Sequence, residues 1–105
     1  MKITYSTVLV LEALARGYRY GFDILDATNL PSGTVYPILR RFENEGLVTS
    51  EWEAQGLATR DQRPPRRYYV LTADGKKLRA QTADRYRATH DVVSRRSRAL
   101  KPTRG

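Results

Sequence analysis

The stretch that decides the fold is Leu30-Pro31-Ser32-Gly33-Thr34-Val35-Tyr36-Pro37-Ile38-Leu39-Arg40-Arg41-Phe42-Glu43. Its apolar residues recur at intervals of three, four and seven, the spacing of one face of an amphipathic helix: Val35, Ile38, Leu39 and Phe42. The other face carries hydroxyl and guanidinium groups, which suit DNA phosphates and base edges. Pro37 crowds the carbonyl four residues earlier, but that residue is Gly33, whose backbone is freer.

A shorter helical pattern from Tyr20 to Ala27 precedes this stretch, with Ile24 and Leu25 as its core contacts. The turn between the two helices contains Asn29, a residue type that tolerates left-handed backbone. Helix, short turn, and helix with a polar outer face predict a helix-turn-helix whose second helix recognises DNA. We expect the acids Asp23 and Asp26 of the first helix to point away from the duplex.

The N-terminal segment from Thr4 to Ala15 is predicted to be a helix that stops at Gly17. Its residues are apolar on most sides, and such a helix is buried on most sides. We expect one face to contact the domain core and another to contact a second chain. The alternative is a well-buried helix in a monomer.

Two β-rich segments follow the recognition helix, which Gly46 ends: Leu47 to Trp52 and Arg67 to Leu71. The connection from Glu53 to Arg66 is polar and lacks a helical period, so it predicts a long hairpin loop. Trp52, at the end of the first strand, is expected to be a packing residue.

This hairpin predicts a wing, because four arginines fall within eight residues of its loop and second strand: Arg60, Arg63, Arg66 and Arg67. The Pro64-Pro65 pair stiffens the loop, which lowers the cost of placing an arginine in a minor groove. The alternative is an ordinary mobile surface loop.

Thr72 and Asp74 mark the start of a further helix, as N-cap and as a favourable charge at its positive end. The helix could run from Ala73 to about Leu100, roughly 40 Å if unbroken. Its seam has heptad-like spacing but few strongly apolar residues, so it needs a partner helix. The seam residues are Leu78, Thr82, Tyr86, Thr89, Val93 and Leu100.

Taken together, these elements predict a fold class that is mainly α with a small β-hairpin. Residues 1–72 form a winged helix-turn-helix DNA-binding domain, and residues 73–105 form a long dimerisation helix and a basic tail.

Composition favours an anionic partner, since the 105 residues carry a net charge of +8 and the pI is about 10.2. Residues 1–50 are neutral, with five basic and five acidic side chains, so the excess lies in the second half. The chain has no cysteine, which excludes disulfides and cysteine-based zinc sites, and its single histidine, His90, argues against a transition-metal site within one chain. Scattered carboxylates and the lack of a glycine-rich phosphate loop predict that the protein is not an enzyme and needs no cofactor.

The N-terminus loosely imitates a signal peptide, but Glu12 interrupts its apolar run. No segment approaches the roughly 20 apolar residues of a membrane span. A cytoplasmic protein without a membrane partner is expected.

Several of these motifs together resemble the PadR family of bacterial transcriptional regulators. The resemblance covers roughly Leu9 to Gly75 and is most specific in its Gly-Thr-x-Tyr-Pro core. The matching residues are Leu14-Ala15-Arg16-Gly17 with Tyr20-Gly21, then Leu30 to Arg41, Gly46-Leu47-Val48, and Arg67-Tyr68-Tyr69-Val70-Leu71-Thr72 with Gly75. Asn29 stands where a glycine is usual, and the wing is longer and richer in arginine than is common.

The resemblance implies a homodimer, formed through the C-terminal helix and the first helix, that binds an inverted repeat in double-stranded DNA, usually as a repressor. It looks like the short branch of the family, with a single C-terminal helix. It also implies which residues meet DNA: Ser32, Thr34, Tyr36 and Arg40 in the major groove or on its phosphates, and Arg63, Pro64, Pro65 and Arg66 at the wing tip. Some relatives bind flat aromatic drugs at the dimer interface. The seam here offers Tyr86 but no tryptophan, so a small-molecule effector is allowed by the resemblance without being indicated by the residues.

Two other functions fit the sequence. One is a winged-helix protein-interaction module whose basic C-terminal helix docks an acidic partner. The other is an RNA-binding protein, which is less well supported because adjacent Tyr68 and Tyr69 cannot both face outward from one strand to stack on bases.

Overall fold

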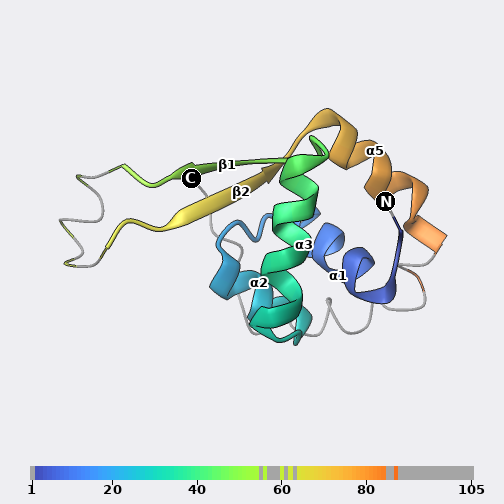
Figure 1. Ribbon diagram of the computed structural model, residues 1–105, viewed down its shortest axis with the longest axis horizontal. Helices are drawn as coiled ribbons and strands as arrows, with labels where there is room; N and C mark the ends of the chain where they lie inside the picture. The colour runs from blue at the N-terminus through green and yellow to red at the C-terminus, as the bar shows by residue number, and fades with distance from the viewer. Residues whose placement is uncertain are drawn as a thin grey trace.

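Three helices come first in the chain, a β-hairpin follows them, and a further helix leaves the hairpin (Figure 1). The structure is a computed structural model, and it describes residues 2–54, 56, 60, 62, 64–84 and 87. The elements are α1 (Tyr5–Ala15), α2 (Gly21–Thr28), α3 (Ser32–Asn44), β1 (Val48–Trp52), β2 (Arg67–Leu71) and α5 (Ala73–Gln81). The hairpin projects from one end of the molecule, and α5 lies at the other end (Figure 1).

The turn between α2 and α3 has the geometry that the sequence predicts. Asn29 adopts left-handed backbone, with φ of 59° and ψ of 27°, and its N–H donates to the carbonyl of Leu25 at 2.8 Å. The hydroxyl of Thr28 donates to the carbonyl of Ile24 at 2.7 Å, a bond back to the preceding turn of the helix. α3 then begins at Ser32 and continues through Pro37.

The hydrophobic core lies where α3 meets α1, α2 and the base of the hairpin. The predicted apolar stripe of α3 is buried along its whole length, and each fully buried side chain of this size stabilises the fold by about 1.5–3 kcal/mol. The stripe consists of Val35, Ile38, Leu39 and Phe42, packed in one cluster with residues that include Leu11, Leu14, Tyr18, Ile24 and Leu71. Helix α1 is buried at every position from Thr7 to Leu14.

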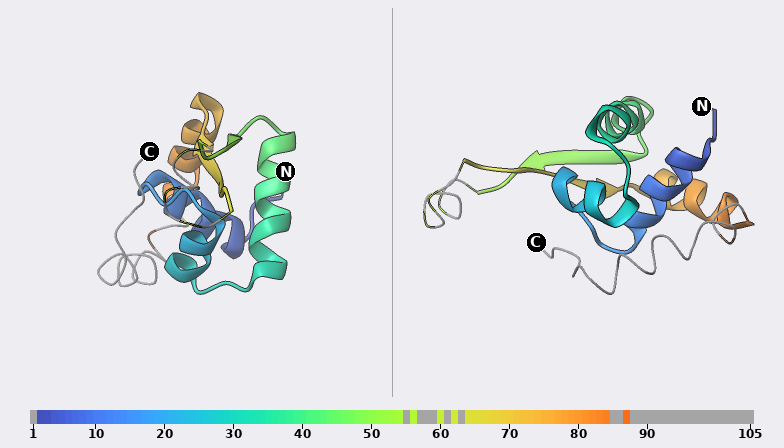
Figure 2. Two further views of the ribbon diagram at one scale, coloured as in Figure 1. Left: turned by 90° about the vertical axis from the view of Figure 1, so that its left-hand side faces the viewer. Right: turned by 90° about the horizontal axis from the view of Figure 1, so that it is seen from below.

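The hairpin is antiparallel, with Val48 opposite Leu71 at its base and Trp52 opposite Arg67 farther out. Tyr20 forms an isolated bridge with Tyr68 on the free edge of β2, which joins the start of α2 to the hairpin. In the right-hand view of Figure 2, α3 lies on one side of the hairpin and α2 on the other. These contacts fix the direction in which the hairpin leaves the helices.

Two predictions about the hairpin are wrong. The connection was expected to lack helix, but two of its described residues, Gly56 and Arg60, have helical backbone. Trp52 was expected to pack, but 63% of it is exposed. It lies too far along the hairpin to reach the core, because the buried pair of the two strands is at their other end.

Helix α5 starts as predicted, with the hydroxyl of Thr72 accepting from the N–H of Gly75 at 3.1 Å. The expected unbroken helix is interrupted, since α5 ends at Gln81 with Thr82 as its C-cap. A half-buried ion pair holds α5 to α1: Glu12 is 2% exposed, and its two carboxylate oxygens accept from Nε and Nη2 of Arg79, whose side chain is 43% exposed, at 2.8 and 2.5 Å. The remaining predicted seam residues, Tyr86, Thr89, Val93 and Leu100, lie outside the described residues, as does His90.

Candidate nucleic-acid interface

The outer face of α3 carries the four residues of this helix that were predicted to meet DNA. Successive residues of a helix are about 100° apart, so Ser32, Tyr36 and Arg40, at intervals of four, form one line beside the buried stripe. Ser32 and Arg40 are exposed, and 39% of Tyr36 is exposed. Thr34 is half-buried and lies at the other edge of the exposed face, next to Arg41. The structure therefore brings three of the four residues together and separates Thr34 from them.

Tyr36 is held against the start of α2. A Cβ atom added to Gly21 would lie 2.6 Å from Cε1 of the Tyr36 ring and would overlap its hydroxyl, so the absence of a side chain at Gly21 makes room for the ring. This contact explains why a glycine in α2 and a tyrosine in α3 occur together in the sequence. It also fixes the ring at the edge of a cleft.

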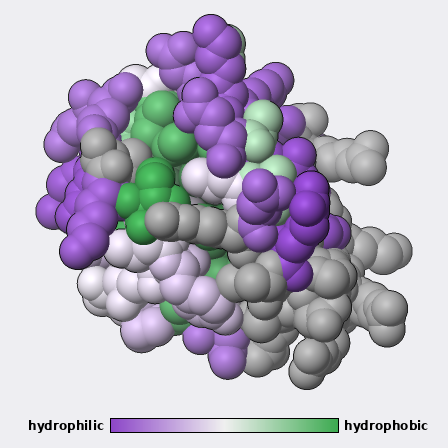
Figure 3. Space-filling model, turned by 90° about the vertical axis from the view of Figure 1, so that its right-hand side faces the viewer, coloured by the Kyte–Doolittle hydropathy of each residue, from purple (hydrophilic) through white to green (hydrophobic). Residues whose placement is uncertain are grey.

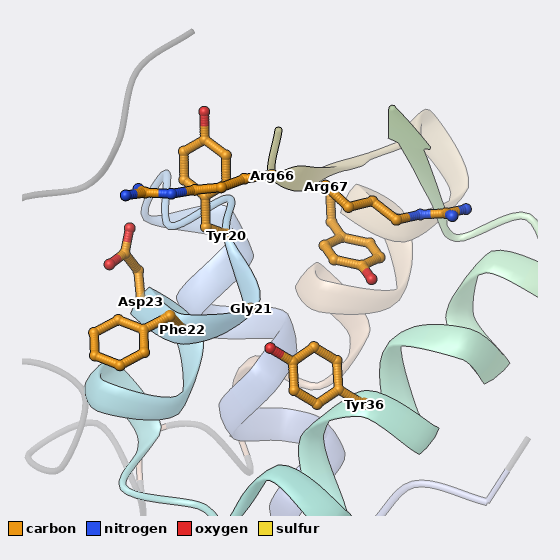
Figure 4. A pocket seen from close by; sticks show the side chains of 8 residues that line it. Tyr20, Gly21, Phe22, Asp23, Tyr36, Arg66 and Arg67 are labelled. Carbon is orange, nitrogen blue, oxygen red and sulfur yellow. The ribbon is translucent and has the colours of Figure 1, made fainter. Parts of the chain in front are cut away.

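The cleft lies between the start of α2, α3 and β2, and has a volume of about 660 Å³ (Figure 4). It is lined by aromatic residues from three elements, two arginines, one aspartate and one glycine: Tyr20, Gly21, Phe22, Asp23, Tyr36, Arg66, Arg67 and Tyr69. Burial raises the pKa of the Tyr69 hydroxyl above its ordinary value. Asp23 lines the cleft, because the first turn of α2 forms part of its wall; the expectation that the acids of α2 point away from a duplex stays a prediction.

Arg66 is positioned by a buried carboxylate at the base of the wing. Glu53 is 8% exposed; its carboxylate accepts from the hydroxyl of Tyr20 at 3.0 Å and from the N–H of Arg66 at 3.1 Å. The guanidinium of Arg66 then lies over the ring of Tyr20, 5.6 Å from its centroid. It makes no ion pair with any described residue. Its charge lies at the wall of the cleft, which also contains the carboxylate of Asp23.

Arg67 has the opposite role, although it is the next residue. Its side chain extends away from that of Arg66 (Figure 4), and its Nη2 lies 3.2 Å from Glu43 of α3. The hydroxyl of Ser50 donates to the same carboxylate oxygen at 2.5 Å and accepts from Nε and Nη2 of Arg67 at 2.9 and 2.6 Å. The bond from Ser50, together with the charge of Arg67, lowers the pKa of Glu43 below its ordinary value. This network ties the hairpin to the recognition helix and neutralises Arg67.

The predicted wing tip is described only in part. Pro64 and Arg66 are exposed and Pro65 is half-buried, whereas Arg63 lies outside the described residues. Within the described residues, no three His, Asp or Glu side chains gather to hold a metal ion. In the same part of the chain, no helix combines the length and apolar character that a membrane crossing requires.

Sequence reasoning missed the residues that set the hairpin in place: Tyr20, Glu43, Ser50 and Glu53. The signal that could have found them is the alternation of a strand, which puts Ser50 and Arg67 on one face once the hairpin register is known. The register of the two strands could not be derived from the sequence, because a loop of this length allows more than one pairing of their residues.

A helix-turn-helix with a hairpin beside its second helix defines a winged-helix DNA-binding protein. Residues 10–81, more than half of the chain, match the Transcriptional regulator PadR-like family. The chain belongs to this family of transcriptional regulators, as the sequence motifs indicated. No curated protein matches the chain.

Solved structures of similar fold include other members of the family. A PadR family transcription regulator from Clostridium difficile is 25% identical with a TM-score of 0.64, over 88% of this chain and 97% of its own. A PadR-like transcription factor from Bacteroides fragilis is 26% identical with a TM-score of 0.62, over 85% of this chain and 86% of its own. BpsR from Bordetella bronchiseptica, whose DNA binding is regulated by 6-hydroxynicotinic acid, is 20% identical with a TM-score of 0.62, over 96% of this chain and 65% of its own; it shares the fold alone.

Proposed function

We propose that the protein is a homodimeric repressor that binds an inverted repeat in double-stranded DNA. The observation that carries this proposal is the shared surface of the recognition helix and the hairpin. The line of Ser32, Tyr36 and Arg40 and the guanidinium of Arg66, which has no ion pair among the described residues, border the same side of the molecule and are separated by one open cleft.

The two parts of this surface suit different features of a duplex. α3 is proposed to enter the major groove, where Arg40 can read a guanine through two parallel hydrogen bonds. The hairpin is proposed to follow the adjacent backbone and to bring its arginines, including Arg63, to the minor groove. The cleft between them would accommodate the sugar-phosphate strand that separates the two grooves. Thr34, at the far edge of α3, is assigned to a phosphate on the other side of the major groove.

A dimer is supported by the end of the molecule opposite the hairpin. There a shallow groove of about 380 Å³ runs between the N-terminal segment and α5, lined in part by Ile3 and Leu78. A neighbouring hollow adds Leu47. Figure 3 views this end and shows apolar side chains gathered among hydrophilic ones. A second copy packed there would leave both hairpins outward, and two recognition helices about 34 Å apart would meet successive major grooves.

The proposal is tested by DNA binding of Arg40→Ala with Lys76→Ala as a matched control. Lys76 is an exposed cation of α5, so its loss removes one positive charge away from α3. Fluorescence anisotropy should show Arg40→Ala weakening binding to the preferred duplex by about 1–3 kcal/mol while random duplexes are affected much less. Equal losses on all duplexes would assign Arg40 to a phosphate. Binding by the wild type that does not distinguish a palindrome from random DNA would contradict the proposal.

A further inference from the structure

Trp52 is the single tryptophan of the chain, and 63% of it is exposed at the end of β1. It is neither part of the core nor close to the apolar end of the molecule. The strand register places it opposite Arg67 and on the same face as Ser50 and Tyr69. This is the face turned toward α3 and the cleft, since Tyr69 lines the cleft and Ser50 bonds to Glu43.

The indole is held in place by its neighbour across the hairpin. The guanidinium of Arg67 lies 5.6 Å from the centroid of the Trp52 ring. Arg67 is itself fixed by Ser50 and Glu43. A large apolar ring is thus presented to solvent on a rigid support, so little conformational entropy would be lost when something packs on it. Such pre-organised aromatic side chains are typical of binding surfaces.

The position of Trp52 indicates what packs there. In the proposed complex, α3 occupies the major groove and the wing tip reaches the minor groove. Trp52 lies between them, at the end of the strand that leads to the tip, where the duplex presents its sugar-phosphate backbone. An indole offers a flat apolar face to the C–H groups of a deoxyribose and an N–H donor to a phosphate oxygen.

We propose that Trp52 is a DNA-backbone contact and that Arg67 is the residue that positions it. This inference rests on the proposed DNA-binding function. Because Glu43 already neutralises Arg67, the contact adds apolar area and one hydrogen bond without adding a free charge. It should therefore strengthen binding to every sequence without changing the salt dependence, unlike the arginine contacts.

The first test uses the fluorescence of Trp52, which reports on this site alone. Titration of the full-length protein with unlabelled duplex should change the emission of Trp52. The midpoint should coincide with that from the anisotropy of a labelled duplex. Binding seen by anisotropy with unchanged emission would overturn the inference and leave the proposed function standing. Absence of binding by both methods would overturn the proposed function, and the inference with it. An emission change that depends on protein concentration without DNA would instead assign this face to a second copy.

The second test compares Trp52→Ala with Trp52→Phe and with Val70→Ala, an exposed residue on the other face of the hairpin. Trp52→Ala should weaken binding to specific and random duplexes by about fivefold or more, the low end of the range for aromatic stacking, with the salt slope unchanged. Trp52→Phe, which keeps a flat ring, should lose less, and Val70→Ala should bind as the wild type. Wild-type affinity in Trp52→Ala, or a lower salt slope, would overturn the inference. Thermal unfolding of all three variants excludes loss of the fold as the cause.

Discussion

Arg66 and Arg67 are adjacent in the sequence, yet the structure predicts different effects when each is replaced by alanine. The guanidinium of Arg66 lies over Tyr20 without an acidic partner among the described residues. The guanidinium of Arg67 is matched by Glu43 at 3.2 Å and bonded to Ser50. Arg66 is therefore expected to neutralise a DNA phosphate, and Arg67 to hold the hairpin against α3.

The expected size of the difference follows from counterion release. Each phosphate neutralised on a duplex contributes about 0.9 to the slope of log affinity against log salt. Arg66→Ala should lower that slope by about 0.9, so the loss of affinity between 50 and 200 mM salt becomes about 3.5-fold smaller. Arg67→Ala should leave the slope unchanged. The Arg67→Ala substitution should instead weaken DNA binding at every salt concentration. It should also lower the free energy of unfolding by about 0.2–1 kcal/mol, the range for exposed ion pairs.

The assay is fluorescence anisotropy of a labelled duplex at a series of salt concentrations over this range. The double variant Glu43→Gln with Arg67→Ala is the control, because it removes the ion pair without changing the net charge. It should have the wild-type slope. The reasoning would be refuted if Arg67→Ala lowered the slope as much as Arg66→Ala, or if Arg66→Ala left it unchanged.

Three further predictions concern stability, each measured by urea unfolding. Arg79→Ala should destabilise the fold by about 1–3 kcal/mol, because it strips the main partner from the buried carboxylate of Glu12 and leaves only Arg16 among the described residues, at 3.9 Å; no loss would place that carboxylate in water. Gly75→Ala should cost about 1–3 kcal/mol, since its Cβ would overlap a backbone carbonyl. A Cβ on Gly33 meets open space, so Gly33→Ala should cost less, namely only what the freer glycine backbone contributes beside Pro37. The pKa of Glu43 is lowered in the folded state, so the ionised carboxylate stabilises the fold at neutral pH, and this stabilisation is lost as the pH falls through the lowered pKa. Glu43→Gln should remove this part of the loss of stability in acid. A variant whose stability depends on pH as the wild type's does would contradict the prediction.

The helical part of the fold could be predicted because its determinants are local. The intervals of three, four and seven in α3 identify its buried stripe without knowledge of any partner. Asn29 and Thr72 mark an end and a start of helices through their own backbone and side-chain preferences. The strand from Arg67 to Leu71 was found with its bounds as observed, since its residues are dense in aromatic and branched side chains.

The remaining errors arose where partners are far apart in the sequence. Glu12 and Arg79 are separated by 67 positions, so their pairing depends on how α5 returns to α1. The exposure of Trp52 depends on how far the hairpin projects beyond the helices, which strand propensity does not specify. The place of Asp23 in the cleft wall could not be predicted, because the cleft is made by the approach of Gly21 to Tyr36, a tertiary contact.

The central claim is that the outer face of α3 and the hairpin together receive a duplex, once in each of two copies. Selection of bound sequences from a pool of random duplexes tests this most directly. We predict recovery of an inverted repeat whose half-sites are about 10–10.5 base pairs apart, with a relaxed preference at one position of each half-site in Arg40→Ala. Recovery of unrelated sequences or of a single unrepeated half-site would contradict the claim.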